Sequence, residues 1–155
     1  MSSLALSLTL LICLLIPLQS QAADPSADRD AAAAVAAEFL NSYILAIPSF
    51  QGSMDAARWV EKSRLATPDF KKRLSELYRR ALKEDPELGY GADAVLGAQD
   101  YPESFRVHKI SIQNGMATAV LRGTRPFEMD VPMVLIREGN SWLVDGSGDL
   151  VPKKR

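Results

Sequence analysis

The stretch FRVHKISIQNGMATAVLR, from Phe105 to Arg122, decides the fold class. Two runs with the character of strands flank the dipeptide Asn114-Gly115, which in such a setting is the strongest short-range signal for a β-hairpin. The pattern predicts strands over residues 105–113 and 116–122 that pair through this turn.

A second hairpin is predicted directly after the first. Residues 127–137 and 142–144 also have the character of strands, and they flank the longer turn Glu138–Ser141. Pro132 interrupts the third strand, and because proline cannot donate to a ladder of backbone hydrogen bonds, it predicts a sheet edge or a bulge there. We therefore expect a four-stranded antiparallel meander.

A long helix is predicted near the start of the chain. Pro48 ends it, because proline disfavours helical geometry in the residue before it. A spacing of four residues gives the helix one apolar stripe, which comprises Val35, Phe39, Tyr43 and Ile47, with Leu40 and Ile44 beside it.

Two shorter helices are predicted between the long helix and the strands. The first is expected to begin with Ser53 as its N-cap and to bury Met54, Ala57 and Val60. The second begins with Thr67 as its N-cap, Pro68 at the first helical position, and Asp69 complementing the helix dipole. Asp85-Pro86 ends it, and its buried face is expected to comprise Phe70, Leu74, Leu77, Tyr78, Ala81 and Leu82.

The order of the elements predicts an α+β fold, with three helices on one face of a curved four-stranded antiparallel sheet. We expect a signal peptide over residues 1–22, a mobile leader over 23–29, a single domain over 30–149 and a basic tail over 150–155. Removal of the signal peptide leaves 155 − 22 = 133 residues, a length that can bury a core of its own.

The N-terminus has the features of a secretory signal. Residues 1–22 contain no charged side chain, residues 4–18 are almost wholly apolar, and Ser20-Gln21-Ala22 offers small residues at the cleavage site. Cleavage would remove Cys13, the only cysteine. We therefore expect a periplasmic or secreted protein without disulfides. A retained membrane anchor is the alternative, but the apolar run is shorter than the roughly 20 residues that a span needs.

Two tracts carry a family resemblance. The three helices and the meander, which ends in EGNSWLVDGSG (Glu138–Gly148), resemble the nuclear transport factor 2-like cone fold of the cystatin-like superfamily. DAVLGAQD (Asp93–Asp100) is similar to a tract in a family of small secreted bacterial proteins of unknown function with that fold. The resemblance covers roughly residues 30–148. It implies a pocket between the first helix and the concave sheet face, where enzymes of the superfamily place a His–Asp pair or similar acids and where many members only bind or scaffold.

Asp93 and Asp100 are the first candidates for chemistry. If residues 94–99 form a single helical turn, Asp93 is its N-cap and accepts a hydrogen bond from a backbone N–H two or three residues on. The alternative is that both acids lie on one side of the turn, as a general acid/base pair or as ligands of a hard metal ion. The structural interpretation is favoured, because two acids are too few for a calcium cage.

His108 is the only histidine. Without a second histidine or a cysteine in the mature chain, the sequence excludes a Cys–His site and a multi-histidine metal site. Strand alternation places His108 on one face with Ile110 and Ile112, toward the core or a pocket. The tract DGSGD (Asp145–Asp149) resembles the start of a calcium loop, but the sequence does not supply the Glu required at its twelfth position. No metal and no cofactor is predicted.

The charge balance disfavours nucleic acid and membrane surfaces as partners. With 18 basic and 19 acidic residues, the net charge is −1, which leaves no global field to attract nucleic acid. Basic residues on the third predicted helix could form a cationic surface, but Glu76 interrupts it and is expected to pair with Arg80. A solvated helix face is therefore expected.

Three functions follow from this sequence. The leading hypothesis is a non-enzymatic periplasmic domain that binds a small apolar ligand or another protein in a pocket lined by Phe39, Tyr43, His108 and Trp142. The second is a hydrolase or isomerase in the same pocket, with His108 as base and Asp93 or Asp100 orienting it. The third is an inhibitor or immunity-type protein that binds a secreted effector by its surface. An open cavity with His108 bonded to a carboxylate would favour the enzyme, and a filled one would favour a protein partner.

Overall fold

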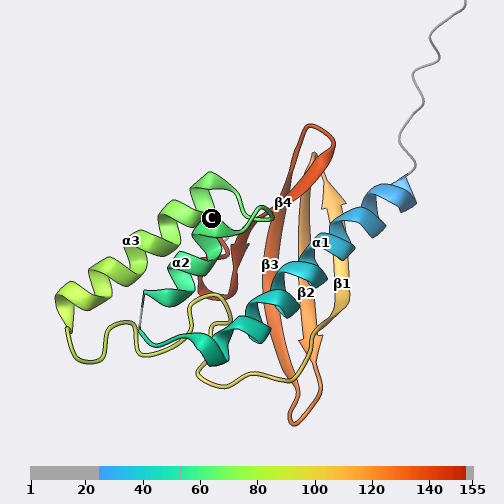
Figure 1. Cartoon of the computed structure of the whole chain (residues 1–155). Helices are drawn as coiled ribbons and strands as arrows, with labels where there is room; N and C mark the ends of the chain where they lie inside the picture. The colour runs from blue at the N-terminus through green and yellow to red at the C-terminus, as the bar shows by residue number, and fades with distance from the viewer. Residues whose placement is uncertain (1–24, 53, 153–155) are drawn as a thin grey trace, which may run out of the picture.

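The computed structural model describes residues 25–52 and 54–152 (Figure 1). The expected signal peptide, Ser53 and the last three residues of the basic tail lie outside the described residues. The elements in chain order are α1 (Pro25–Ala46), the 3-10 turn η1 (Ile47–Ser49), α2 (Asp55–Lys62), α3 (Pro68–Glu84), β1 (Arg106–Gln113), β2 (Met116–Gly123), β3 (Met129–Glu138), β4 (Ser141–Ser147) and the 3-10 turn η2 (Gly148–Leu150).

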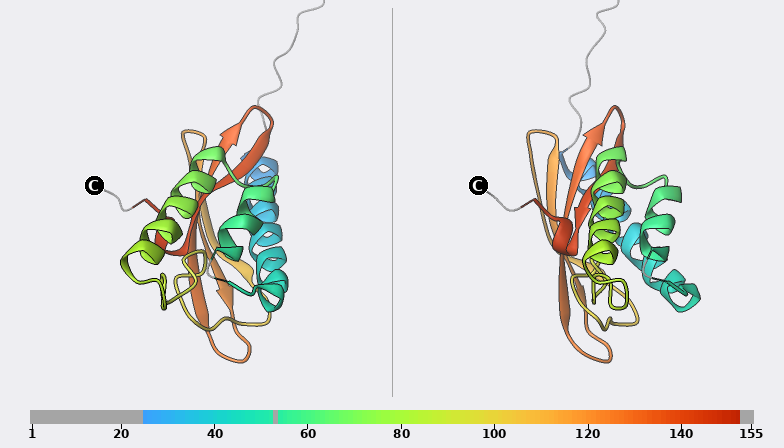
Figure 2. Two further views of the ribbon diagram at one scale, coloured as in Figure 1. Left: turned by 60° about the vertical axis from the view of Figure 1, so that its left-hand side comes forward. Right: turned by 90° about the vertical axis from the view of Figure 1, so that its left-hand side faces the viewer.

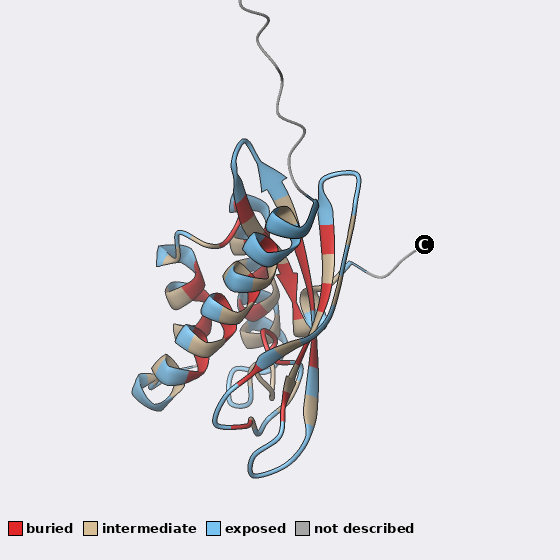
Figure 3. Cartoon of the chain, turned by 90° about the vertical axis from the view of Figure 1, so that its right-hand side faces the viewer, coloured by how far each residue is buried: buried red, intermediate tan, exposed pale blue. Residues whose placement is uncertain are grey.

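The four strands form one antiparallel sheet in the order β1-β2-β3-β4. All three helices lie on one side of this sheet (Figure 2), and α1 runs across it (Figure 1). The residues that are buried lie where the helices and the sheet face each other (Figure 3). The predicted α+β fold, with three helices on one face of a four-stranded meander, is confirmed.

The first hairpin turns at the predicted dipeptide. Asn114 and Gly115 have φ angles of 53° and 72°, and a two-residue turn with positive φ at both positions matches the twist of the strands that it joins. Gln113 pairs with Met116 directly across the turn. Local turn chemistry was therefore sufficient to place this hairpin.

The second hairpin has a shorter turn than predicted. Glu138 pairs with Ser141, so only Gly139 and Asn140 lie between β3 and β4. Gly139 has a φ of 60°, which is the left-handed region that glycine adopts without steric cost.

Pro132 lies inside β3, opposite Val120 of β2. β4 pairs only with Met133–Glu138, so Pro132 lies just beyond the end of that ladder. Although β3 is a central strand for most of its length, it is an edge strand at this proline. This agrees with the predicted edge.

α1 begins earlier than predicted, because residues 25–29 of the expected mobile leader are helical. Proline suits the first turn of a helix. In that turn the Asp28 carboxylate accepts hydrogen bonds from Trp142 Nε1 at 2.9 Å and from Arg137 Nη1 at 3.0 Å. These bonds tie the start of α1 to β3 and β4.

By length and composition alone, α1 together with η1 is apolar enough to cross a membrane. In the fold it is a core helix that packs on the sheet. Its buried residues are Ala32, Ala36, Phe39, Leu40, Tyr43 and Ile44. Much of its apolar character comes from alanine, which lets the helix lie close to the strands.

The shorter helices follow the predictions closely. Thr67 caps α3 and its Oγ1 accepts a hydrogen bond from the Phe70 N–H at 3.0 Å. Of the predicted inner face of α3, Phe70, Leu74 and Tyr78 are buried and the other three residues are half-buried. In α2, Ala57 and Val60 are buried as predicted, whereas Met54 is half-buried and holds the N-cap position that was expected for Ser53.

Candidate functional site

Asp93 lies at the start of a tight turn in the segment between α3 and β1. Its Oδ1 accepts hydrogen bonds from the N–H groups of Val95 and Leu96, at 2.9 and 3.0 Å. Its backbone carbonyl accepts further bonds from Gly97 and Ala98. This confirms the prediction that Asp93 caps the turn by accepting hydrogen bonds from N–H groups two and three residues further along the chain.

The second carboxylate oxygen of Asp93 binds a residue that the sequence did not connect to it. Oδ2 accepts a hydrogen bond from the Tyr43 hydroxyl of α1 at 2.5 Å. Burial raises the pKa of the Asp93 carboxyl, against the lowering effect of the bonds from Tyr43, Leu96 and Val95. Burial, and next the charge of Asp93, raise the pKa of the Tyr43 hydroxyl. Asp93 thus fixes the loop to the core helix.

Asp100 is not brought together with Asp93. It is exposed beyond the turn, and no hydrogen bond joins the two acids. Within the described ranges, no group of three or more His, Cys, Asp or Glu side chains could hold a metal ion. The paired-acid interpretation therefore has no geometry to support it.

The two tracts that carried the family resemblance meet in space. The Asp149 N–H donates to the Ala94 carbonyl at 3.0 Å, and Ser147 Oγ donates to the Val95 carbonyl at 2.8 Å. Gly148 adopts a φ of 56°, and a Cβ there would lie only 2.6 Å from the Val95 carbonyl oxygen. The DGSGD tract is thus a turn that docks on the Asp93 loop.

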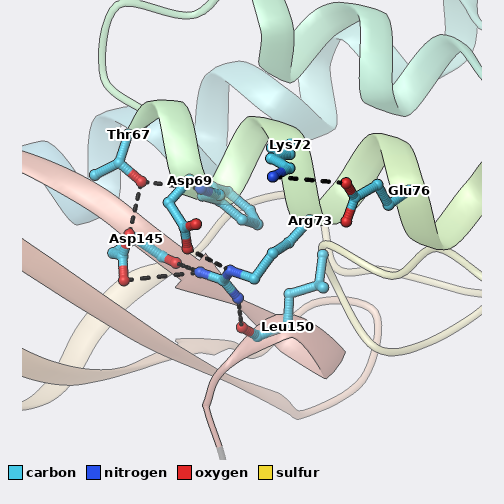
Figure 4. Close-up of polar contacts among 8 residues, drawn as sticks. Thr67, Asp69, Lys72, Arg73, Glu76, Asp145 and Leu150 are labelled. Carbon is cyan, nitrogen blue, oxygen red and sulfur yellow. Dashed lines mark hydrogen bonds and ion pairs between the residues drawn. The ribbon is translucent and has the colours of Figure 1, made fainter.

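Arg73 of α3 ties the same C-terminal segment from its other side (Figure 4). Its guanidinium donates to Asp69 Oδ2 at 2.7 Å, to the Leu150 carbonyl at 2.8 Å and to the Asp145 carbonyl. Thr67 Oγ1 donates to Asp145 Oδ1 at 2.6 Å. Arg73 is one of the basic residues of α3 for which a solvated helix face was expected, and only its spacing of four from Asp69 indicates an ordered role.

The solvated face of α3 itself is close to what was predicted. Glu76 forms an exposed ion pair with Lys72 at 4.0 Å (Figure 4), rather than the expected pair with Arg80. An exposed pair of this kind contributes little to stability. The face therefore carries no sign of a built site.

His108 is exposed rather than directed to the core. Val107 pairs with Leu121 and Lys109 pairs with Val120, so His108 is the extra residue of a β-bulge. A bulge breaks the period of two on which the predicted orientation depended. Among the described residues, no hydrogen bond joins the His108 ring to a carboxylate. The prediction that His108 faces Ile110 and Ile112 on the inner side was wrong.

The other three proposed pocket residues are buried. Phe39 and Tyr43 are 0% exposed and Trp142 is 4% exposed. The rings of Phe39 and Tyr43 stack with centroids 6.5 Å apart, and Trp59 packs edge-on against both, at 5.6 and 5.2 Å. Phe39 and Tyr43 thus pack within the core against α2, whereas Trp142 lines a surface pocket of about 320 Å³ together with Val35 of α1. The structure does not bring His108 to any of them.

A surface pocket of about 340 Å³ opens beside the Asp93 loop. Its lining residues come from the η1–α2 connection, α2, α3 and the α3–β1 segment, and include Phe50, Ala56, Tyr78, Leu88, Tyr90 and Asp93. Leu88 is 68% exposed, which makes it one of the most exposed large apolar side chains in the described part of the chain.

No family model matches the chain, and no curated protein matches it. Two solved chains share its fold. One is from the type VI native effector–immunity complex Tae3–Tai3 of Ralstonia pickettii, with a TM-score of 0.51 and 18% identity over 79% of this chain and 96% of that chain. The other is from the selenomethionine form of the complex, with a TM-score of 0.50 and 16% identity over 78% of this chain and 97% of that chain.

Proposed function

We propose that the chain is an immunity-type protein, which binds a secreted effector through its surface and blocks that effector's action. The observation that carries the proposal is the fold shared with chains of an effector–immunity complex, which extends over 96% of the first of those chains. A complex of this kind requires a protein partner, which was the third of the functions weighed from the sequence.

The interior of the fold supports a binding role over pocket catalysis. Phe39 and Tyr43, two of the residues expected to line a ligand pocket, are 0% exposed and stack on each other in the core. Asp93 accepts hydrogen bonds from Tyr43 and from two backbone N–H groups, and His108 is exposed on a bulge. A small apolar ligand between α1 and the sheet is not favoured by any of these contacts.

The finer parts of the sequence-based interpretation remain predictions. Export to the periplasm rests on the features of residues 1–22, and immunity to an effector that acts outside the cytoplasm would require it. Membership in the nuclear transport factor 2-like superfamily rests on the order of the elements and on the arrangement of helices on one face of the sheet.

A competition assay tests the proposal. A strain without this gene should be killed by sibling cells that deliver the effector, and the full chain should restore survival. A chain without residues 1–22 should restore little, because it would stay in the cytoplasm. Attackers unable to secrete the effector serve as control. Equal survival of the deletion strain and the parent strain under attack would contradict the proposal.

A further inference from the structure

The pocket beside the Asp93 loop has aromatic walls. Phe50, Tyr78 and Tyr90 all line it, and the rings of Tyr78 and Tyr90 meet edge to face with centroids 5.8 Å apart. Aromatic faces carry a negative electrostatic potential, which attracts a cation within roughly 6 Å of the ring centroid. A volume of about 340 Å³ is at the lower end for ligand pockets and suits a single side chain.

The surroundings of the pocket are acidic. Asp93 is the one charged residue among its described lining residues, and the Tyr90 hydroxyl donates to Asp149 Oδ2 at 2.9 Å. The segment 85–105, which supplies much of the lining, contains no Lys, Arg or His, and its acids are Asp85, Glu87, Asp93, Asp100 and Glu103. Such a field favours a basic partner and speeds its encounter.

We propose that this pocket holds a cationic side chain, Lys or Arg, that the protein partner presents. The proposal rests on the proposed function in so far as the partner is the effector. The half-buried rings of Phe50 and Tyr90 would contact the cation and the aliphatic stem, with the buried Tyr78 behind them. Leu88 would cover the stem from the solvent side, and Asp93 would supply the counter-charge.

The state of Asp93 agrees with this assignment. Burial raises the pKa of its carboxyl. The hydrogen bonds from Tyr43, Leu96 and Val95 therefore do not fully offset the cost of burying its negative charge. A cation nearby favours the charged form of a carboxyl group. Occupation of the pocket should therefore lower the pKa of Asp93.

The pocket can be tested with small probes. The α-acetylated amides of arginine and lysine are titrated into the exported protein, and the backbone amide shifts of residues around the pocket are followed by NMR. The acetylated amides of norleucine and glutamate are the uncharged and the anionic control. We expect saturable shifts at Tyr78, Tyr90 and Asp93 with the cationic probes only.

Variants show whether the charge and the ring act as proposed. Asp93→Asn keeps the cap and should weaken binding of the arginine probe about tenfold, whereas Asp100→Asn, in the same segment but outside the pocket, should change it less than twofold. Tyr90→Leu removes a ring at a half-buried position and should also weaken binding. Equal binding of the norleucine and arginine probes, or shifts spread equally over Asp100, would overturn the proposal.

Failure of this inference is distinguishable from failure of the proposed function. If the parent protein gives no protection in the competition assay, the proposed function fails whatever the probes do. If Asp93→Asn loses probe binding but binds the effector as tightly as the parent protein, the effector does not use the pocket and the inference fails alone. A loss of effector affinity of about tenfold in Asp93→Asn, but not in Asp100→Asn, is the expected result.

Discussion

The carboxylate of Asp93 accepts three hydrogen bonds, one from the Tyr43 hydroxyl and two from the backbone N–H groups of Val95 and Leu96. The two backbone bonds were predictable, because an acid just before a tight turn caps it. The bond from Tyr43 was not, since it joins residues that lie 50 positions apart. At the scale of single residues, the sequence reveals local partners and hides distant ones.

Asn and Ala at position 93 should have different effects. Asp93→Asn should lose no more than about 1 kcal/mol in the free energy of unfolding, because its Oδ1 keeps the cap and its amide N–H can donate to the Tyr43 oxygen, although it no longer accepts from the Tyr43 hydroxyl. Asp93→Ala should lose about 2 kcal/mol, since it removes the cap and leaves the buried Tyr43 hydroxyl without its acceptor. Urea denaturation at pH 7 measures both. Equal losses would show that the negative charge itself is needed.

The pKa of Asp93 also predicts a pH dependence. Because the folded-state pKa is raised above 3.8, the protonated form is favoured by folding. Its stabilising contribution is present below the unfolded pKa and is lost as the pH rises through the folded pKa. The stability of Asp93→Asn relative to the parent should therefore increase as the pH rises from about 4 toward neutrality. A difference that stays flat or decreases over this range would contradict the raised pKa.

At the scale of elements, local signals placed the hairpin at Asn114-Gly115 and the start of α3 at Thr67. They missed the start of α1, because Asp28 is held by Trp142, more than 100 residues away. They also missed the orientation of His108, because one extra residue in β1 reverses the alternation. Errors of both kinds come from contacts between elements.

The docking of η2 on the Asp93 loop predicts a strong effect at Gly148. Gly148→Ala would force an L-residue into positive φ, at about 1 kcal/mol, and would place a methyl group 2.6 Å from a backbone oxygen. We expect a total loss of about 3 kcal/mol in unfolding free energy. Gly139→Ala is the matched control, since its φ is 60° with nothing within 4 Å, and it should lose about 1 kcal/mol. Similar losses in the two variants would exclude the close approach at Gly148.

Arg73 should anchor α3 to the C-terminal segment. Arg73→Ala removes charge-assisted bonds to the carbonyls of Asp145 and Leu150 and should cost about 2 kcal/mol in thermal or urea unfolding. Arg80→Ala, on the exposed face of the same helix, should stay within about 0.5 kcal/mol. A small effect of Arg73→Ala would mean that the segment is held by its turn alone.

At the scale of the whole molecule, the order of helices and strands was sufficient to predict the α+β fold. The state of its interior was not predictable, because it depends on how side chains from different helices fit together. Trp59 of α2 closes against Phe39 and Tyr43 of α1, and no pattern within either helix indicates that contact. Because these side chains fill the core, the surface is favoured over an interior ligand pocket as the place where the protein binds its partner.

The most direct test of that account is the affinity of the exported protein for the effector that kills the deletion strain. Calorimetry of the two purified proteins should give a 1:1 complex with a dissociation constant below about 100 nM, as expected for a specific interface of standard size, and the effector in that complex should be inactive. Absence of binding at micromolar concentrations, or an effector that stays fully active with the protein in excess, would contradict an immunity function.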